Sequence, residues 1–334
     1  MRVIGSAALT TQMAYSRIIG LVLAVCWAAS AAANDAYKVN PGPFEIVAVE
    51  IELPFPELDK QLPLRIAYPG TPGQYPVIVF SHGGGCPKDM YLRLSDHWAS
   101  HGYVVISPVH ADSRSLLPSF AGLDPKTLGQ LIYNRRYDMQ HVLNSLDTIE
   151  AQVPELAGQL DRNRLVAAGH SMGGATAMAV TGLVLEDSSG RFVDRFDEDR
   201  FDVLLLIGDP GNRDFMPEGP WRAIALPTLI VTGSNDYGQK FGGGPMKLDF
   251  PDGIEFADTP NHYVFITDMD HYMGGLICRS DVSGPLDYDA VAITRSVSTA
   301  FLDAYAKDDD EARRFLSSDE LPGLTDGRAT LEER

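Results

Sequence analysis

Leu165–Ala175 reads LVAAGHSMGGA, and this stretch decides the fold. It begins as a short apolar strand, turns tightly at Ser171 and continues as a helix of small residues. A serine at such a turn is forced towards strained backbone angles, so Gly169 and Gly173 leave the room that bulkier residues would fill. The helix that begins at Met172 points its free N–H groups and the positive end of its dipole at the serine oxygen.

The five residues from Gly169 to Gly173 form a Gly-x-Ser-x-Gly pattern, which is typical of a nucleophile elbow. Two glycines and a serine at this spacing arise by chance in roughly one chain in ten of this length. The alternative is a glycine-rich turn with an idle serine. The flanking strand and helix, and the chemistry placed elsewhere in the chain, therefore have to carry the prediction.

The first 33 residues differ from the rest of the 334-residue chain. Arg2 and Arg17 supply positive charge, Ile18–Trp27 is an apolar run, and small residues fill 28–33. This composition predicts a secretory signal peptide over 1–33. A retained membrane anchor is disfavoured because the run is shorter than the roughly 20 residues that span a bilayer. A lipoprotein signal at Cys26 is the other alternative.

The remaining chain has an ordinary globular composition and a strong negative charge. Hydrophobic residues make up 45% and charged residues 22%, which fits one large domain. Removing the signal peptide would take the formal net charge from −18 to −20. Such a surface repels nucleic acid and anionic membranes, and nothing after the leader is apolar for long enough to cross a bilayer. We therefore predict an exported, soluble protein, secreted or periplasmic, that does not bind nucleic acid.

Strands and helices alternate along the chain from residue 75 onward. An amphipathic hairpin over 44–53 and 64–68 comes first, and the later strands are continuous apolar runs, as in a parallel sheet buried on both faces. The strands are predicted at 75–81, 103–107, 165–168, 202–208, 227–233 and 263–267, and the helices at 89–100, 128–149, 172–185, 291–307 and 311–316.

This alternation predicts an α/β fold: a doubly wound, mostly parallel sheet with helices on both faces. No insertion between strands is long enough for a large cap domain. We assign residues 34–316 to the catalytic domain and 317–334 to a polar C-terminal tail.

A serine hydroxyl needs a base to remove its proton, and the base needs an acid to orient it. In this architecture, the acid and then the histidine follow the serine in sequence, each after a strand. Only His262 and His271 lie after Ser171. His262 precedes its strand, which places it at the wrong end of the sheet, so His271 is the predicted general base.

Two aspartates follow buried strands at positions suited to the acid. Asp236 comes directly after the penultimate parallel strand and is the favoured residue. Asp209 lies one strand closer to the serine and is the rival. Asp268 and Asp270 are too close to His271 in sequence for an easy triad and are predicted to shape its loop.

The tetrahedral intermediate of acyl transfer needs two N–H donors directed at its oxyanion. The Met172 amide is predicted to be one of them. The second is expected from the loop that follows the strand 75–81, with Gly84 the favoured residue and Gly83 close by. Glycine suits this role because the backbone itself has to approach the substrate.

Two cysteines remain after the leader, Cys86 and Cys278. An isolated pair in an oxidising compartment is a disulfide candidate. Cys86 follows the glycine run and Cys278 lies seven residues beyond His271, so a bond would join two active-site loops. Two separate buried thiols are the alternative.

The chain resembles the dienelactone-hydrolase-like α/β-hydrolases, and within them the exported esterases akin to platelet-activating-factor acetylhydrolase and bacterial polyester hydrolases. The resemblance covers roughly residues 41–316 and implies Ser171, Asp236 and His271 as the triad, with Gly84 and Met172 as the oxyanion hole. Dienelactone hydrolases use a cysteine nucleophile, so that group's name says little about the substrate here. The motifs that carry the resemblance are Pro76–Gly84, Ser107–Asp112, Arg135–Asp138, Gly169–Thr176, Gly233–Asp236 and Asp270–His271.

These observations predict an exported serine hydrolase that cleaves carboxylic esters through an acyl-enzyme. This chemistry needs no metal and no organic cofactor. The substrate is expected to be a small or polymeric ester, and the oligomeric state is left open. Two alternatives stand beside it: a lipase or polyester hydrolase acting at an interface, and a binding protein that keeps the fold without turnover.

Overall fold

The computed structural model describes residues 38–333 apart from 118–124, 184, 187–191, 195, 197, 209–223, 240–244, 248–257 and 283. Contacts divide the chain into residues 1–40 and 41–334, and every described helix and strand lies in the second unit. The predicted signal peptide 1–33 lies outside the described residues. No helix among the described residues is long and apolar enough to cross a membrane.

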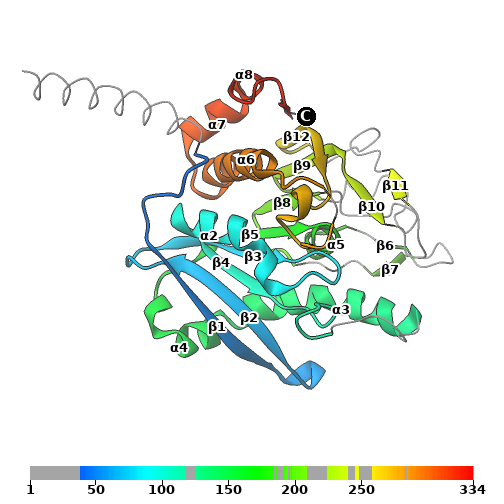
Figure 1. The fold of residues 1–334 in the computed structure, drawn as a ribbon. Helices are drawn as coiled ribbons and strands as arrows, with labels where there is room; N and C mark the ends of the chain where they lie inside the picture. Colours follow the sequence, from blue (N-terminus) through cyan, green and yellow to red (C-terminus); the bar gives the residue numbers. More distant parts are fainter. Residues whose placement is uncertain are drawn as a thin grey trace, which may run out of the picture. The chain divides into compact units, whose positions relative to one another are not determined.

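A nine-stranded sheet of described residues forms the centre of the unit 41–334 (Figure 1). Its order is β1-β2-β4-β3-β5-β8-β9-β12-β13. The strands from β4 to β12 in this order run parallel, while β1, β2 and β13 pair antiparallel at the two edges. The strands are β1 Ile46–Phe55, β2 Lys60–Pro69, β3 Tyr75–Ser81, β4 Val104–Pro108, β5 Leu160–His170, β8 Val203–Ile207, β9 Thr228–Asn235, β12 Asn261–Asp270 and β13 Ala329–Glu333.

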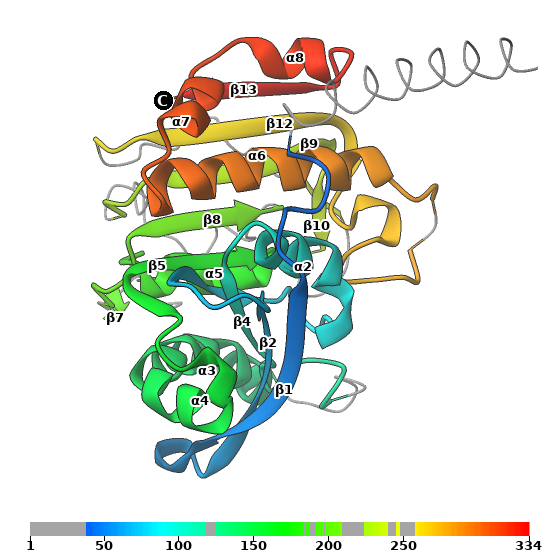
Figure 2. The ribbon, with the colours of Figure 1, turned by 90° about the vertical axis from the view of Figure 1, so that its left-hand side faces the viewer.

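Helices cover both faces of this sheet. α2 and α6 contact one another and lie on one face, while α3 and α5 contact one another and lie on the other (Figures 1 and 2). The predicted fold class, a doubly wound and mostly parallel sheet, is therefore confirmed. The helices are α2 Leu92–Ser100, α3 Pro125–Asn144, α4 Leu146–Gln152, α5 Met172–Val180, α6 Tyr288–Ala306, α7 Asp310–Leu316 and α8 Glu320–Leu324, with 3-10 turns η1 Pro56–Leu58, η2 Lys88–Tyr91, η3 Pro154–Leu156 and η6 Met273–Gly275.

The burial of the strands explains their composition. All seven residues of β3 and all five of β8 are buried, as expected for strands covered on both faces, whereas β1 alternates from Val49 onward between exposed positions and positions that are partly or fully buried. Outside the main sheet, the described residues form only two small pairs of strands, β6 Leu185–Glu186 with β7 Phe192–Asp194 and β10 Tyr237–Gln239 with β11 Pro245–Lys247.

The segment predicted to be a polar tail, 317–334, differs from that prediction. It carries α8 and then β13, which pairs antiparallel with β12 from Ala329↔Ile266 to Glu333↔His262. The residues of β13 alternate in burial, and those that face solvent are polar, as suits an edge strand. The composition of β13 therefore resembles that of a polar tail. The sheet therefore extends beyond the boundary at residue 316.

Candidate active site

Ser171 stands at the turn between β5 and α5 with φ 55° and ψ −122°, a strained conformation for a residue that is not glycine. The two flanking glycines make the turn possible. A Cβ on Gly169 would lie 2.2 Å from the Gly173 carbonyl oxygen, and a Cβ on Gly173 would lie 1.9 Å from that of Ser81. Any side chain at either position would push the turn off the sheet. The serine is half-buried and presents its hydroxyl at the carboxyl end of β5.

The register of two neighbouring strands brings Asp236 and His271 together. In the parallel pair β9 and β12, Asn235 stands opposite Asp270. The next residue of each strand is therefore Asp236 on one side and His271 on the other. Both side chains are buried, at 4% and 5% exposure.

Three side chains form a continuous hydrogen-bonded chain at this end of the sheet. His271 Nδ1 lies 2.5 Å from Asp236 Oδ1, and His271 Nε2 lies 2.7 Å from Ser171 Oγ. Because a carboxylate only accepts, Nδ1 carries the proton of a neutral imidazole and Nε2 is left to accept from the serine hydroxyl.

The environment of Asp236 keeps its carboxylate ionised. Burial raises its pKa, but the adjacent His271 and hydrogen bonds from His271 and Thr232 outweigh burial, so the pKa lies below its ordinary value. An ionised carboxylate behind a neutral imidazole is the arrangement that stabilises the imidazole when it takes a proton.

The loop after β3, residues 82–91, which we call the glycine loop, lies against the elbow. A Cβ on Gly84 would meet the side chain of Met172, which places Gly84 beside the first residue of α5. The Gly83 amide, the other amide considered for an oxyanion hole, donates instead to the Tyr91 hydroxyl at 3.0 Å. The Gly83 amide is therefore already bonded, and Gly84 and Met172 remain the predicted pair.

Arg135 and Asp112 hold the glycine loop through hydrogen bonds to its backbone. Sequence reasoning did not assign this role to either residue. Arg135 forms a bidentate pair with Asp112 at 2.6 and 2.8 Å and donates to the His82 and Gly83 carbonyls. Asp112 also accepts from the Gly85 amide at 2.9 Å. Burial raises the pKa of Asp112, but the charge of Arg135 and the hydrogen bonds from Arg135 together outweigh burial, so the pKa lies below its ordinary value and the carboxylate is ionised. Both residues lie in the motifs quoted for the family resemblance, which was the only sequence signal for them.

A second, buried Ser–His–Asp chain contacts the glycine loop, and sequence reasoning did not predict it. His110 Nε2 lies 2.8 Å from Ser81 Oγ, and His110 Nδ1 lies 2.9 Å from Asp138 Oδ2. All three side chains are buried, and Lys60 forms an ion pair with Asp138 at 2.5 Å. The His110 amide donates to His82 Nε2, so this buried chain is continuous with the glycine loop.

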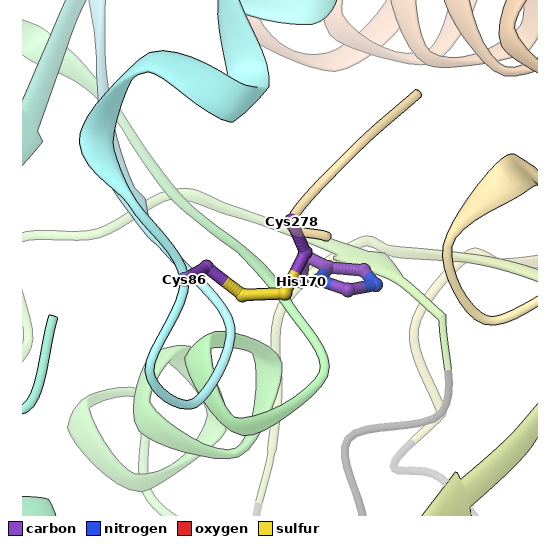
Figure 3. Close-up of side chains that lie close together, drawn as sticks. All are labelled: Cys86, His170 and Cys278. Carbon is purple, nitrogen blue, oxygen red and sulfur yellow. A yellow bond between two sulfur atoms is a disulfide. The ribbon is translucent and has the colours of Figure 1, made fainter. Parts of the chain in front are cut away.

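A disulfide joins Cys86 to Cys278, the pair that the sequence offered as a candidate (Figure 3). Cys86 lies in the glycine loop, and Cys278 lies in residues 271–282, which we call the histidine loop. Together with His170 they form the one cluster of potential metal ligands found among the described residues. Because the two sulfurs are bonded to each other, they do not offer thiolates to an ion.

The other sequence predictions fall in two groups. His262 lies at the amino end of β12 with Nε2 2.8 Å from the Tyr305 hydroxyl, away from Ser171, and Asp270 accepts the Tyr272 and Gly274 amides and so shapes the histidine loop. Asp209, the rival acid, lies outside the described residues.

Comparison with known proteins finds ester hydrolases. Residues 33–192 match the family described as Chlorophyllase. The chain is 28% identical to chlorophyllase-1 of Arabidopsis thaliana over 148 residues, 42% of this chain and 41% of that protein. It is 25% identical to platelet-activating factor acetylhydrolase of Cavia porcellus over 139 residues and 29% identical to that of Bos taurus over 143, in each case 32% of both chains.

The chain thus spans 32–41% of the length of these relatives. The matches confirm the predicted resemblance to platelet-activating-factor acetylhydrolase. They also agree with the predicted enzyme class, a carboxylic-ester hydrolase.

Proposed function

We propose that this chain, an α/β-hydrolase related in sequence to chlorophyllases and platelet-activating factor acetylhydrolases, hydrolyses carboxylic esters through an acyl-enzyme on Ser171. One observation carries the proposal. His271 lies within hydrogen-bond distance of both the Ser171 hydroxyl and the Asp236 carboxylate, at the carboxyl edge of a parallel sheet.

In the first half of the reaction, Ser171 Oγ attacks the ester carbonyl while His271 Nε2 takes the hydroxyl proton. Asp236 accepts from Nδ1, which fixes the tautomer and stabilises the imidazolium. The imidazolium then gives its proton to the alcohol oxygen, the alcohol leaves, and the acyl group stays on the serine. Water attacks the acyl carbon by the same route, which frees the acid and restores the serine.

The negative charge that develops on the carbonyl oxygen needs donors already in place. The Met172 amide is in the first turn of α5, where backbone N–H groups have no partner within the helix. Gly84 lies beside it without a Cβ, so its amide can approach the same oxygen. The bidentate Arg135–Asp112 pair holds the loop that carries this amide.

A fluorophosphonate probe tests the nucleophile directly, because it reacts with an activated serine and stays attached. We expect one adduct, on Ser171, in the folded protein, and none after denaturation or in Ser171→Ala. Peptide mass spectrometry locates the adduct. A folded protein that takes no label at Ser171 would contradict the proposal.

The acyl and alcohol preferences distinguish a small-ester hydrolase from one that acts on lipid or polymer. A series of p-nitrophenyl esters of increasing chain length ranks acyl groups. A rise in rate when the substrate aggregates identifies interfacial action. Residues 209–223, 240–244 and 248–257 lie outside the described residues, so this experiment, and not the pocket shape, decides the preference.

We also propose that the protein is exported. The charged, apolar and small-residue pattern of residues 1–33 supports this, and the Cys86–Cys278 disulfide fits an oxidising compartment. Expression of the full chain in a host with a secretory pathway, followed by N-terminal sequencing, is expected to show cleavage close to residue 33. An intact N-terminus on intracellular protein would contradict the proposal.

A further inference from the structure

His170, the second residue of the Gly-His-Ser turn, is fully buried and has partners on both ring nitrogens. Nε2 lies 2.9 Å from the His271 carbonyl oxygen, and Nδ1 lies 2.8 Å from the Tyr91 hydroxyl. A carbonyl only accepts, so Nε2 carries the proton and Nδ1 accepts from the tyrosine. The ring therefore donates to the histidine loop and accepts from the glycine loop.

The tie on the glycine-loop side continues to the backbone next to the oxyanion site. The Tyr91 oxygen accepts the Gly83 amide at 3.0 Å, one residue before Gly84. A hydrogen-bonded path thus runs from Gly83 through Tyr91 and His170 to the backbone of His271. Its two ends lie in the loop that presents Gly84 and in the residue that supplies the imidazole.

The disulfide connects the same two loops by a separate route. Cys86 lies three residues after Gly83, and Cys278 lies in the histidine loop after η6. The two sulfurs and a ring nitrogen of His170 lie within 4.8 Å of one another, and Figure 3 shows the ring beside the disulfide. One tie is covalent and the other is made of hydrogen bonds, and they run in parallel.

We propose that His170 is a positioning residue for the ester hydrolysis proposed above, and that it and the Cys86–Cys278 disulfide are two parallel ties between the oxyanion donor and the general base. Each tie alone is sufficient to keep the loops in register. Loss of both lets the loops separate, and a misplacement of about 1 Å costs roughly 100-fold in rate.

The chemistry of the position favours histidine. Burial and the neighbouring His271 lower the pKa of His170 to about 3, so at neutral pH the ring has one donor and one acceptor. Glutamine at 170 can keep the donor toward the His271 carbonyl, and asparagine can keep the acceptor toward Tyr91. Neither can make both bonds at the histidine geometry, and Tyr91→Phe removes the same tie at another point.

The test is a double-mutant cycle between the two ties. The variants are His170→Gln, the double change Cys86→Ala with Cys278→Ala, and all three together. We expect each tie alone to lower kcat by less than about 5-fold and the combination to lower it by at least about 100-fold, with KM little changed. Adding Tyr91→Phe to His170→Gln is expected to cost nothing further in rate, because both break one tie.

His262→Gln is the matched control. His262 is likewise buried and bonded to a tyrosine hydroxyl, that of Tyr305, but at the opposite end of the sheet. It is expected to lower the melting temperature as His170→Gln does, without lowering kcat and without any excess loss when combined with the cysteine changes. All rates are measured on protein that circular dichroism shows to be folded.

Losses that multiply, or a combined loss smaller than the product, would overturn the proposal, since parallel ties require a combined loss above the product. If the triple variant does not fold, His170→Gln is folded with its disulfide and then treated with a phosphine reductant, and the same criterion applies. A wild-type protein that takes no fluorophosphonate on Ser171 refutes the esterase itself. A labelled, active protein with multiplicative losses refutes only the paired ties.

Discussion

Two Ser–His–Asp chains lie at the carboxyl end of this one sheet. In the first, His271 bridges Ser171 and Asp236 at 2.7 and 2.5 Å. In the second, His110 bridges Ser81 and Asp138 at 2.8 and 2.9 Å. The atoms that meet are the same in both: Nε2 with the hydroxyl and Nδ1 with the carboxylate.

The two chains differ in the surroundings of their serines. Ser81 is the last residue of a central strand and is 0% exposed, so no ester can reach its oxygen. Ser171 is half-buried at a positive-φ turn, with the Met172 amide at the start of a helix and Gly84 nearby. Connectivity alone therefore does not make a nucleophile. Under the proposed function, access and backbone donors to the oxyanion decide which serine does chemistry, and we expect the buried chain to act on stability.

The largest effect is expected from the serines. Ser171→Ala should lower kcat by about 10⁶-fold, because the nucleophile is removed. Ser81→Ala should leave kcat unchanged and lower the free energy of unfolding by about 1–3 kcal/mol, because His110 Nε2 loses its buried donor. Steady-state hydrolysis of p-nitrophenyl acetate and urea denaturation measure the two quantities. A folded Ser81→Ala protein without activity would remove the distinction between the two chains.

The aspartates should differ in the same way. Asp236→Asn is expected to lower kcat by about 10⁴-fold, because an amide stabilises the wrong imidazole tautomer. Asp138→Asn leaves the Lys60 ammonium without its partner and is expected to act on stability. Melting curves and single-turnover rates for both variants make the comparison. Equal rate losses in the two would show that the buried chain takes part in the reaction.

The folded state should lose stability in acid because several histidines are buried in their neutral form. Burial lowers the pKa of His82, His110 and His170, the last to about 3, so the unfolded chain binds protons that the folded chain excludes below pH 6.5.

Stability is then complete above the ordinary histidine pKa and falls with pH, by about 2 kcal/mol at pH 5 from His170 alone. His170→Gln should flatten the dependence of the unfolding free energy on pH between 7 and 5. A slope equal to that of the wild type would contradict the assignment.

The smallest expected effect concerns the Arg135–Asp112 pair. Arg135→Lys keeps the charge but loses the bidentate geometry toward Asp112. We expect kcat to fall by about 10-fold with KM unchanged, because the Gly84 amide is held less firmly. Fluorophosphonate labelling rates should fall in parallel. An unchanged kcat would show that the buried polar region stabilises the fold without acting on the site.

The features predictable from the sequence were those with a strong local pattern or a fixed order. The elbow needed only its glycines, and His271 followed from the rule that the base comes last and after its strand. Asp236 followed from strand order, and the register of Asn235 with Asp270 explains its place beside His271.

Other features depend on distances between segments far apart in the chain. These features join residues from different strands, helices and loops, and no periodic pattern in the sequence predicts such contacts. They are the Arg135–Asp112 pair, the His110 chain and the two bonds of His170. The bond of the Gly83 amide depends on a tyrosine hydroxyl eight residues away from Gly83. Strand β13 was missed because an edge strand that is polar on its open side looks like a solvated segment.

That last strand has a practical consequence. Pairing of residues 329–333 with β12 covers the backbone groups of the strand that ends beside His271. A truncation before residue 329 would uncover them and offer a ready template for intermolecular pairing. Shortened versions of this chain are therefore expected to precipitate, and an affinity tag at this end should be joined through a flexible spacer.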